Sequence, residues 1–418
     1  MQKNLRVFVD IGELLTLQGA EQKGARRAQE ADLSAIKDAA LVCGPDGRVL
    51  WCGPKAQLKA DTLAPYEGSS SVQTVSLQGR TVLPGFVECH THTVFAGNRA
   101  EEFEWRMQGQ TYQEISAKGG GILSTVRETR KASAEELTRM AQARVDRFKK
   151  QGVTTLEIKS GYGLDLETEL RCLRVARGLQ GPRVITTYLG AHSRSPDHPD
   201  LKSYVRFMID SVLPKVKAEQ LADRVDIYIE KGFYETDLAR EYLAAAHQLG
   251  LPVTAHVEQL SDSGGTELAL DFQAQSVDHV VFLSAGTMAR VASSEVTAVL
   301  LPTSDLYLKM RYPPARELIA QGARVALSTD YNPGTSPTQD LSLVGVLARL
   351  EMGMTLPEVL VAFTLGGAYA LGLASQVGSL SHGKHCDFIV VDGSWRDLFY
   401  GVGQHPVTAV YRSGTPIL

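Results

Sequence analysis

Apolar runs and amphipathic stretches alternate through the middle of this chain. Between residues 81 and 330, short β-prone runs bounded by turn residues are separated by stretches of helical periodicity, such as SAEELTRMAQARVDRFKKQG. Runs of this kind indicate buried strands, and the stretches between them indicate helices. The predicted strands are Val82–Cys89, Val153–Lys159, Arg183–Leu189, Arg224–Glu230, Pro252–Val257, Ser276–Leu283, Ala298–Pro302 and Arg324–Ser328. Eight strands with helical crossovers predict an α/β fold, a parallel (β/α)8 TIM-like barrel.

The two ends of the chain follow a different pattern, in which short strands are joined by turns. LVCGPDGRVLWCG holds two β-prone runs around Pro-Asp-Gly, which indicates a hairpin, and HCDFIVVDG continues this style near the C-terminus. We expect residues 1–80 and 376–418 to meet in one small β-sandwich module, with the barrel spanning 81–375. A doubly wound open sheet is the alternative, but no G-x-G-x-x-G follows the first predicted strand.

Composition narrows the class of protein. The 418 residues are 44% apolar and 22% charged, as in ordinary globular domains. With a net charge of −4 and no basic cluster, we expect no nucleic-acid partner, and without a run of about 18 apolar residues we expect no membrane span. The five cysteines are scattered and form no C-x-x-C pair, which favours neither disulfides nor a thiolate metal site. Since the N-terminus also lacks a signal-peptide pattern, we expect a reducing, cytoplasmic setting.

Two histidines one residue apart, His90 and His92, follow the first predicted barrel strand in the sequence PGFVECHTH. In an extended chain, residues two apart point to the same side, so both imidazoles can reach one cation. Imidazole nitrogen suits borderline divalent metals such as zinc or iron. This segment therefore predicts a metal site at the end of the first strand.

Polar residues recur where the other predicted strands end. In a (β/α)8 barrel the active site lies at the C-terminal ends of the strands, so these residues should converge. A single one could be a cap or a turn residue, as Asp330 could be before Asn-Pro-Gly, but recurrence around the barrel favours a site. The residues are Arg99, Tyr162, His192, His256, Glu258, Gln259, Asp278, His279 and Asp330.

Four of the strand-end residues form a candidate set of ligands for a single metal ion: His90, His92, His256 and Asp330. Three neutral nitrogens and one carboxylate leave a divalent ion partly uncompensated, so the ion can lower the pKa of a bound water toward neutrality. His279 is the candidate to stabilise charge or to protonate the leaving nitrogen, because its unperturbed pKa is about 6.5. Asp330 could also take the water proton.

Longer stretches of the chain resemble the amidohydrolase superfamily. The resemblance rests on PGFVECHTH, on His256, on STD at the eighth strand and on the tail GSLSHGKHCDFIVVDG. Within that superfamily, GVTTLEIKSGYGLDLETELRCLRVAR, TTYLGAH and STDYNPGTSP are similar to a branch that acts in histidine degradation. The resemblance implies hydrolysis of the cyclic amide 4-imidazolone-5-propanoate to N-formimidoyl-L-glutamate, with one zinc or iron ion. By analogy with the family, a homodimer is also expected.

The resemblance also implies a set of residues that contact substrate or product. Those implied to contact substrate are Arg99, Tyr162, His192 and Gln259, and those at product-contacting positions are Asn332, Gly334 and Thr335. The residue types agree with this substrate. The Arg99 guanidinium can bind a carboxylate through two N–H groups, and Tyr162 offers a hydroxyl and a flat face between two glycines.

The sequence leaves the residue that transfers the proton open among Glu258, Gln259 and His279. Some family members carry glutamate where this chain has Gln259, which cannot titrate. Glu258 would share the face of His256 if the strand stayed regular. Asp278 precedes His279, and because adjacent strand residues face opposite ways, we expect only one of them to point into the barrel mouth. We favour His279.

The absence of a lysine from the fourth predicted strand bears on the number of metal ions. Many relatives in the superfamily hold two metals bridged by a modified lysine on that strand, but RVDIYIE contains no lysine. Lys159 instead ends the second strand, where it could pair with Glu157. A single metal is therefore expected, although the sequence does not choose between zinc and iron.

Two other functions compete with this prediction. A metal-dependent aminohydrolase that deaminates a heterocycle would share the predicted ligands but not Arg99, SGYG and NPGTSP. A non-catalytic scaffold would be expected to lose ligands, and this sequence retains all four. The run Gly119–Gly121 could be a flexible lid or a ligand contact, and the sequence does not decide between them.

Overall fold

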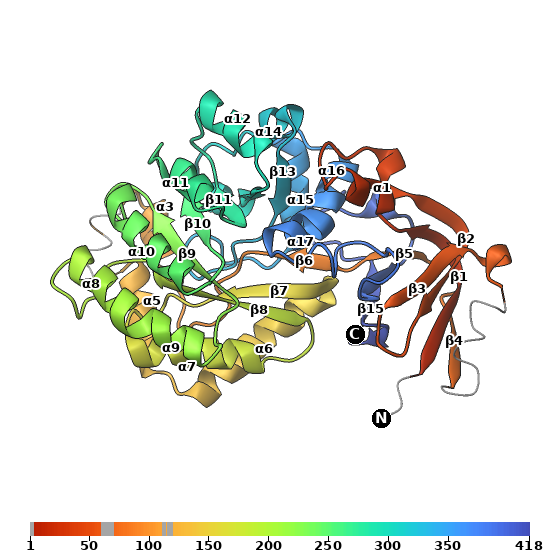
Figure 1. Cartoon of the computed structure of the whole chain (residues 1–418), viewed down its shortest axis with the longest axis horizontal. Helices are drawn as coiled ribbons and strands as arrows, with labels where there is room; N and C mark the ends of the chain where they lie inside the picture. The colour runs from red at the N-terminus through yellow and green to blue at the C-terminus, as the bar shows by residue number, and fades with distance from the viewer. Residues whose placement is uncertain (1–3, 60–70, 111–113, 115–119) are drawn as a thin grey trace.

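The computed structural model describes residues 4–59, 71–110, 114 and 120–418. In these residues eight parallel strands follow one another around the sheet in chain order, which confirms the predicted barrel (Figure 1). The strands are β6 (Phe86–Glu88), β7 (Val153–Lys159), β8 (Arg183–Ala191), β9 (Arg224–Ile229), β10 (Thr254–Val257), β11 (Ser276–His279), β12 (Thr297–Leu300) and β13 (Arg324–Leu327). Each of the eight lies inside a predicted run or begins within two residues of a predicted start, and the first is shorter than its predicted run.

The first and last strands meet just beyond their ends, and this contact nearly closes the barrel. Thr91 and Tyr331 form a parallel bridge, in which the His92 N–H donates to the Tyr331 carbonyl at 2.8 Å. Below the bridge, the Glu88 carboxylate accepts hydrogen bonds from the Ser328 hydroxyl and from the Thr329 N–H, the latter at 2.9 Å. The residues that follow β6 and β13 are therefore held beside each other.

Helices connect the barrel strands and cover the outside of the sheet (Figure 1). In α6, Leu137, Ala141, Val145 and Phe148 recur at helical spacing and are fully buried, and Ser133 begins the helix with a capping box. The main helices are α3 (Ala100–Met107), α5 (Ile122–Lys131), α6 (Ala134–Lys150), α7 (Leu166–Gly178), α8 (Leu201–Phe207), α9 (Leu213–Ala218), α10 (Thr236–Gln248), α11 (Gly265–Asp271), α12 (Ala285–Ser293), α13 (Pro302–Leu308), α14 (Ala315–Gln321), α15 (Leu341–Leu350), α16 (Leu356–Val361) and α17 (Gly367–Ala370).

Strands from both ends of the chain form a second, mixed sheet, which fits the predicted sandwich module (Figure 1). The predicted hairpin is the antiparallel pair β2–β3, whose turn is closed by a hydrogen bond from the Gly44 N–H to the Arg48 carbonyl. The strands are β1 (Leu5–Leu15), β2 (Ala35–Cys43), β3 (Val49–Pro54), β4 (Val72–Ser76), β5 (Thr81–Pro84), β14 (Phe388–Val391), β15 (Val407–Arg412) and β16 (Thr415–Pro416).

The prediction of one continuous strand from Val82 to Cys89 is wrong. The chain breaks at Gly85, so that β5 pairs with β1 and β14 in the terminal sheet whereas β6 pairs with β7 in the barrel. A side chain at Gly85 would collide with Thr154, since a Cβ there would lie 2.2 Å from its methyl group. This segment thus joins the two sheets, and the domain limits at residues 80 and 375 stay a prediction.

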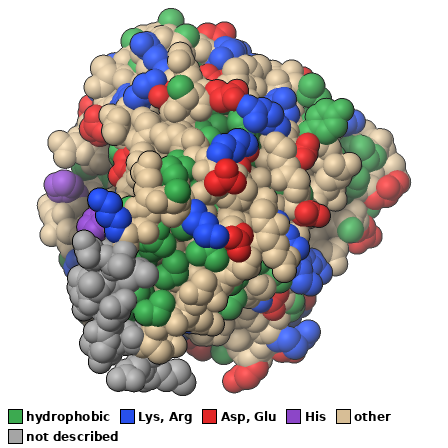
Figure 2. All heavy atoms as spheres, turned by 90° about the vertical axis from the view of Figure 1, so that its right-hand side faces the viewer, with side chains coloured by type: hydrophobic (Ala, Val, Ile, Leu, Met, Phe, Trp, Pro, Cys, Tyr) green, Lys and Arg blue, Asp and Glu red, His purple; other side chains and the backbone are tan. Residues whose placement is uncertain are grey.

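Aromatic packing fills the core of the terminal module. The rings of Phe388 and Tyr411 stack at 4.4 Å between centroids, and Phe8 packs edge-on against Phe388 at 4.8 Å. Figure 2 shows the outer face of this module, on which basic and acidic side chains are interspersed. Within the part of the chain that is described, no helix combines the length and the apolar character needed to cross a bilayer.

Candidate active site and metal centre

A cavity of about 430 Å³ opens where the barrel strands end. Its walls include apolar side chains, such as Phe233 and Leu260, and ten polar or aromatic residues that the sequence predicts for the site or places beside it. These ten are His92, Arg99, Tyr162, His192, His256, Gln259, His279, Asp330, Asn332 and Thr335, of which Asn332 and Thr335 follow the eighth strand. The structure therefore brings residues from most of the barrel strands to one place, as the strand-end prediction required.

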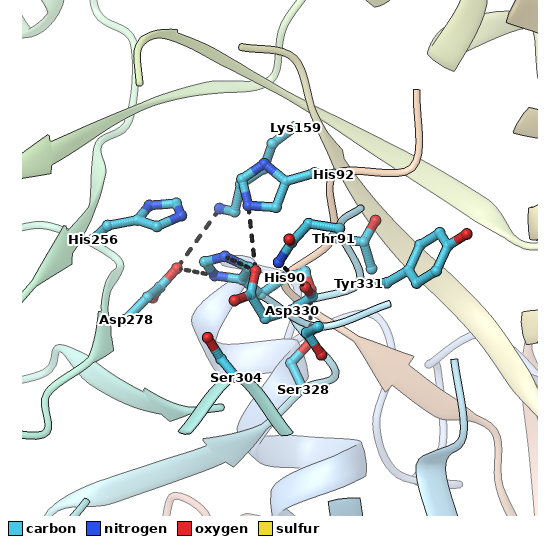
Figure 3. Close-up of polar contacts among 12 residues, drawn as sticks. His90, Thr91, His92, Lys159, His256, Asp278, Ser304, Ser328, Asp330 and Tyr331 are labelled. Atoms are coloured by element: carbon cyan, nitrogen blue, oxygen red, sulfur yellow. Dashed lines mark hydrogen bonds and ion pairs between the residues drawn. The ribbon is translucent and has the colours of Figure 1, made fainter. Parts of the chain in front are cut away.

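The four predicted metal ligands converge at the floor of this cavity (Figure 3). The Nε2 atoms of His90 and His92 each lie 3.4 Å from Asp330 Oδ1, and the ring of His256 lies 4.5 Å from that of His90. Ligand atoms bound about 2.1 Å from a tetrahedral ion are about 3.4 Å apart, so this spacing suits a shared cation. His256 Nε2 is buried without a hydrogen-bond partner, which also fits a metal ligand.

Two carboxylates bond to the Nδ1 atoms of two imidazoles and so fix the orientation of these rings. His90 Nδ1 bonds to Asp278 Oδ2 at 2.7 Å, and His256 Nδ1 bonds to Asp226 Oδ1 at 3.2 Å. When Nδ1 carries the proton and donates it to a carboxylate, Nε2 keeps its lone pair for a cation. Asp226 was not among the predicted site residues, although an acidic residue in the middle of the predicted strand RVDIYIE was a usable signal.

The charges around the ligands perturb their pKa values in opposite directions. Burial and the Lys159 ammonium lower the pKa of His90, but Asp278 and Asp330 outweigh them and raise it to about 9. Burial lowers the pKa of His92 to about 4, despite the opposing effect of Asp330. Although burial raises the pKa of Asp330, its contacts with the two histidines hold it well below the usual range. A cation that binds here therefore competes with a proton mainly at His90.

Of the adjacent residues Asp278 and His279, only His279 lines the cavity, while Asp278 faces the ring of His90. Asp278 bonds to His90, while the His279 ring lies 5.3 Å from His256 and lines the cavity. The strand ends at His279 with a left-handed backbone, φ 77°. Burial holds the pKa of His279 well below its usual range, so the ring is neutral.

The predicted catalytic role of Glu258 does not fit its position. Its backbone is also left-handed, φ 47°, which turns the side chain away from the face of His256. Its carboxylate accepts hydrogen bonds from the Gly265 N–H at 2.7 Å and the Thr266 N–H at 2.9 Å, at the start of α11. Glu258 is therefore a buried cap for that helix and does not line the cavity.

Arg99 lies in the cavity wall, where Glu102 and Gly334 fix its guanidinium. Its Nε donates to Glu102 Oε2 at 2.8 Å, and Nη2 lies 2.7 Å from the same oxygen. The other Glu102 oxygen accepts from the Gly121 N–H, while Gly119 lies outside the described residues. A Cβ at Gly334 would lie 2.0 Å from Arg99 Nη1, so only glycine leaves room for this arrangement. Glu102 was missed because its partner is not evident from the sequence.

Three further predicted residues present polar groups to the cavity. His192 stacks on His92 with ring centroids 5.1 Å apart, and its Nδ1 bonds to the Gly161 carbonyl at 3.0 Å, which leaves Nε2 as an acceptor. Burial raises the pKa of Tyr162, so its hydroxyl keeps the proton and can donate. Gln259 is also buried in this wall, and its amide approaches Ser304 Oγ at 3.5 Å. These groups can bind the polar edge of a small ring.

The turn after the eighth strand is organised by Asn332. Its Oδ1 accepts from the N–H groups of Gly334 and Thr335, and its Nδ2 donates to the Asp330 carbonyl at 2.7 Å and to Thr335 Oγ1 at 2.9 Å. Asn332 therefore lines the cavity with an amide that is already used inside its own loop. Its position fits the support of Asp330 and Thr335 better than a direct contact with a ligand.

The chain is similar to known proteins over nearly its full length. A model of the amidohydrolase family matches residues 81–417. The imidazolonepropionase of Bdellovibrio bacteriovorus is 50% identical over 408 residues, which cover 98% of this chain and 95% of that protein. The imidazolonepropionase of Porphyromonas gingivalis strain W83 is 38% identical over 410 residues, which cover 97% of this chain and 95% of that protein.

Solved structures of low sequence identity share the fold. Escherichia coli guanine deaminase superimposes with a TM-score of 0.73 at 16% identity, over 99% of both chains. An adenosine deaminase from Xanthomonas campestris with bound zinc superimposes with a TM-score of 0.70 at 18% identity, over 98% of this chain and 92% of that one. At such identities the likeness concerns the fold alone.

Proposed function

This chain belongs to the amidohydrolase family and, within it, to the imidazolonepropionases, and we propose that it hydrolyses 4-imidazolone-5-propanoate to N-formimidoyl-L-glutamate. It is a hydrolase that acts on a cyclic amide. The proposal includes one divalent metal ion, zinc or iron, held by His90, His92, His256 and Asp330. A cytoplasmic location and a homodimer remain predictions from the sequence.

The proposal of a metal centre rests on one observation, the spacing of the four ligand side chains. His90 Nε2, His92 Nε2 and Asp330 Oδ1 approach one another at the spacing of ligands around an ion, and His256 Nε2 lies beside them without a partner. An ion bound there would polarise a water molecule and the substrate carbonyl, and it would lower the pKa of that water. Side chains of the protein would transfer the protons and bind the substrate.

We assign proton transfer to His279 and Asp330. Both line the cavity, His279 is neutral and Asp330 is ionised, so both can accept a proton from the attacking water. Water adds to the ring carbonyl carbon, the C–N bond of the cyclic amide breaks, and the ring nitrogen must gain a proton as it leaves. His279 is the group that can accept the first proton and return it to this nitrogen.

Arg99 is the proposed partner of the substrate propionate. Because Glu102 engages Nε and Nη2, we assign the carboxylate to Nη1, which lies over Gly334. Tyr162 would donate its hydroxyl to the substrate, and His192 Nε2 would accept a ring N–H. The amide of Gln259 offers a further polar contact, and Thr335 completes this side of the cavity.

Metal analysis combined with product analysis tests the proposal. The purified protein is expected to hold about one zinc or iron ion per chain and to convert 4-imidazolone-5-propanoate into N-formimidoyl-L-glutamate without release of ammonia. Release of ammonia from a heterocyclic amine, without ring opening of the imidazolone, would instead identify a deaminase. The deaminases with the same fold do not favour that alternative, since their identities of 16% and 18% concern architecture only.

A further inference from the structure

Lys159 ends β7, and its buried ammonium group is directed toward Asp278 beside the rings of the proposed ligands (Figure 3). Its side chain is 0% exposed, and Nζ lies 2.8 Å from Asp226 Oδ2, 3.0 Å from Glu157 Oε2 and 3.6 Å from Asp278 Oδ2. A charge can be buried this deeply only when carboxylates pair with it. Burial lowers the pKa of Lys159, but Asp226 and Glu157 raise it above its usual range, so the amine is charged.

The carboxylates on either side of Lys159 are the ones that orient two proposed metal ligands. Asp226 accepts from the ring of His256, and Asp278 accepts from the ring of His90. Lys159 therefore links the supports of both rings through one ammonium group. A shift of this group would move both imidazoles together, because each ring is bonded to a carboxylate that Lys159 holds.

The charges buried around Lys159 explain why one ammonium group is enough to pair with both supporting carboxylates. Glu157 is also paired with Arg224, whose Nε donates to Glu157 Oε1 at 3.0 Å. Since Arg224 balances Glu157, the Lys159 ammonium remains to pair with Asp226 and Asp278. These three carboxylates and two cations together carry one negative charge. Asp330 adds a second negative charge on the other side of the histidines. A single divalent cation at the four ligands balances both of these charges.

We propose that Lys159 is a positioning residue of the metal centre, which holds both supporting carboxylates and fills the place where a second cation would bind. This proposal deepens the proposed function and rests on it. Asp226, His256 and Asp278 together offer ligand atoms within 4.8 Å of one another, and Nζ lies against two of these residues. Asp278 Oδ1 is buried without a hydrogen-bond partner and is available to a cation. In this chain the lysine thus sets the number of metal ions at one.

The test replaces Lys159 by methionine and counts cobalt ions. Apo-protein is loaded with Co²⁺, and the metal is measured by mass spectrometry together with the visible spectrum of the bound ion. The wild type is expected to bind about one Co²⁺ per chain, and Lys159→Met about two, with about 10–100-fold weaker binding at the first site. Turnover of Lys159→Met should fall through kcat more than through KM, because Lys159 touches no substrate.

Lys384 provides the matched control. It is a buried lysine of the terminal module that pairs with Glu21 at 2.9 Å, away from the barrel mouth. Lys384→Met also removes a buried ammonium group, but it should bind about one Co²⁺ with an unchanged spectrum. A Lys159→Met protein with one Co²⁺ and the wild-type spectrum would overturn the proposal.

A double variant covers the case in which Lys159→Met fails to fold. Lys159→Met with Asp278→Asn removes one charge of each sign, and the amide oxygen introduced by the second substitution can still accept from His90. This protein should fold and bind about one Co²⁺. Binding of two ions, or failure of the double variant to fold, would count against the role of Lys159. A wild type that binds no Co²⁺ would refute the metal centre of the proposed function itself, which is a distinct outcome.

Discussion

The barrel mouth and the terminal module bury residues of opposite kinds. At the mouth, His256 Nε2, His279 Nδ1 and Asp278 Oδ1 are buried and find no hydrogen-bond partner among the residues that the structure describes, and His279 adopts a left-handed backbone. In the module, Phe8, Phe388 and Tyr411 pack ring against ring. One region thus keeps polar atoms in a costly state, and the other removes apolar surface from water.

This difference separates function from stability within one chain. An unpaired buried polar atom costs about 1–3 kcal/mol, and such atoms persist mainly where a ligand or a reaction uses them. Stacked aromatic rings contribute to stability and need no ligand. Substitutions at the mouth should therefore change metal binding and catalysis, whereas substitutions in the module should change the free energy of unfolding.

The largest effect is expected from His256→Ala. Loss of one of four ligands should remove the metal and, with it, at least about 10⁴-fold in kcat/KM, since both depend on the ion. Metal content and activity are measured on the same preparation. His247→Ala, on the exposed face of α10, is the control and should change neither quantity. Full metal occupancy in His256→Ala would rule out this ligand.

His279→Gln should separate proton transfer from metal binding. The ring lines the cavity but is not one of the four ligands, so the variant is expected to retain the metal and lose about 10²–10⁴-fold in kcat. Asp278→Asn is the comparison, because it acts through His90 and should weaken metal affinity by about 10–100-fold. If His279→Gln keeps full activity, another group transfers the proton.

Arg99→Met tests the recognition of the substrate carboxylate. Loss of a buried charge partner should cost about 2–5 kcal/mol of transition-state binding, measured as kcat/KM. A substrate analogue without the carboxylate should respond little to the same change. Gly334→Ala should act in the same direction with a smaller effect, because the added Cβ displaces Arg99 Nη1. An unchanged kcat/KM in Arg99→Met would place the carboxylate elsewhere.

Phe388→Leu is the counterpart in the terminal module and has the smallest expected effect. Loss of two ring contacts should lower the free energy of unfolding by about 1–2 kcal/mol, as measured by urea denaturation. Metal content and kcat should remain those of the wild type. A fall in metal content would show that the two regions are coupled more tightly than their contacts indicate.

The strand order and the grouping of the four proposed ligands could be predicted from the sequence because both follow from simple regularities of the fold. Alternation along a strand placed His90 and His92 on one face, and the ends of parallel strands placed His256 and Asp330 beside them. The resemblance to a known superfamily added residues such as Arg99, which the structure places in the cavity wall. The strand order needs only backbone regularity, whereas Asp330 reaches the histidines from a left-handed position, φ 51°, just after its strand.

The errors arose where the backbone leaves that regularity. The left-handed residue Glu258 turned its side chain away from the expected face, and a glutamate does not signal a turn as a glycine or asparagine would. The break at Gly85 divided one apolar run between two sheets. Partners such as Glu102 for Arg99 depend on packing of a loop against a strand end, which no local pattern specifies.

The contact between the first and last barrel strands has a consequence for folding. Glu88 and Thr329, which form part of it, are 241 residues apart in the chain. Closing so long a loop is entropically costly and slow, so this closure is expected late in folding. During synthesis, His90 and His92 leave the ribosome long before Asp330. The proposed set of four ligands thus cannot be completed on a nascent chain until nearly the whole barrel has emerged.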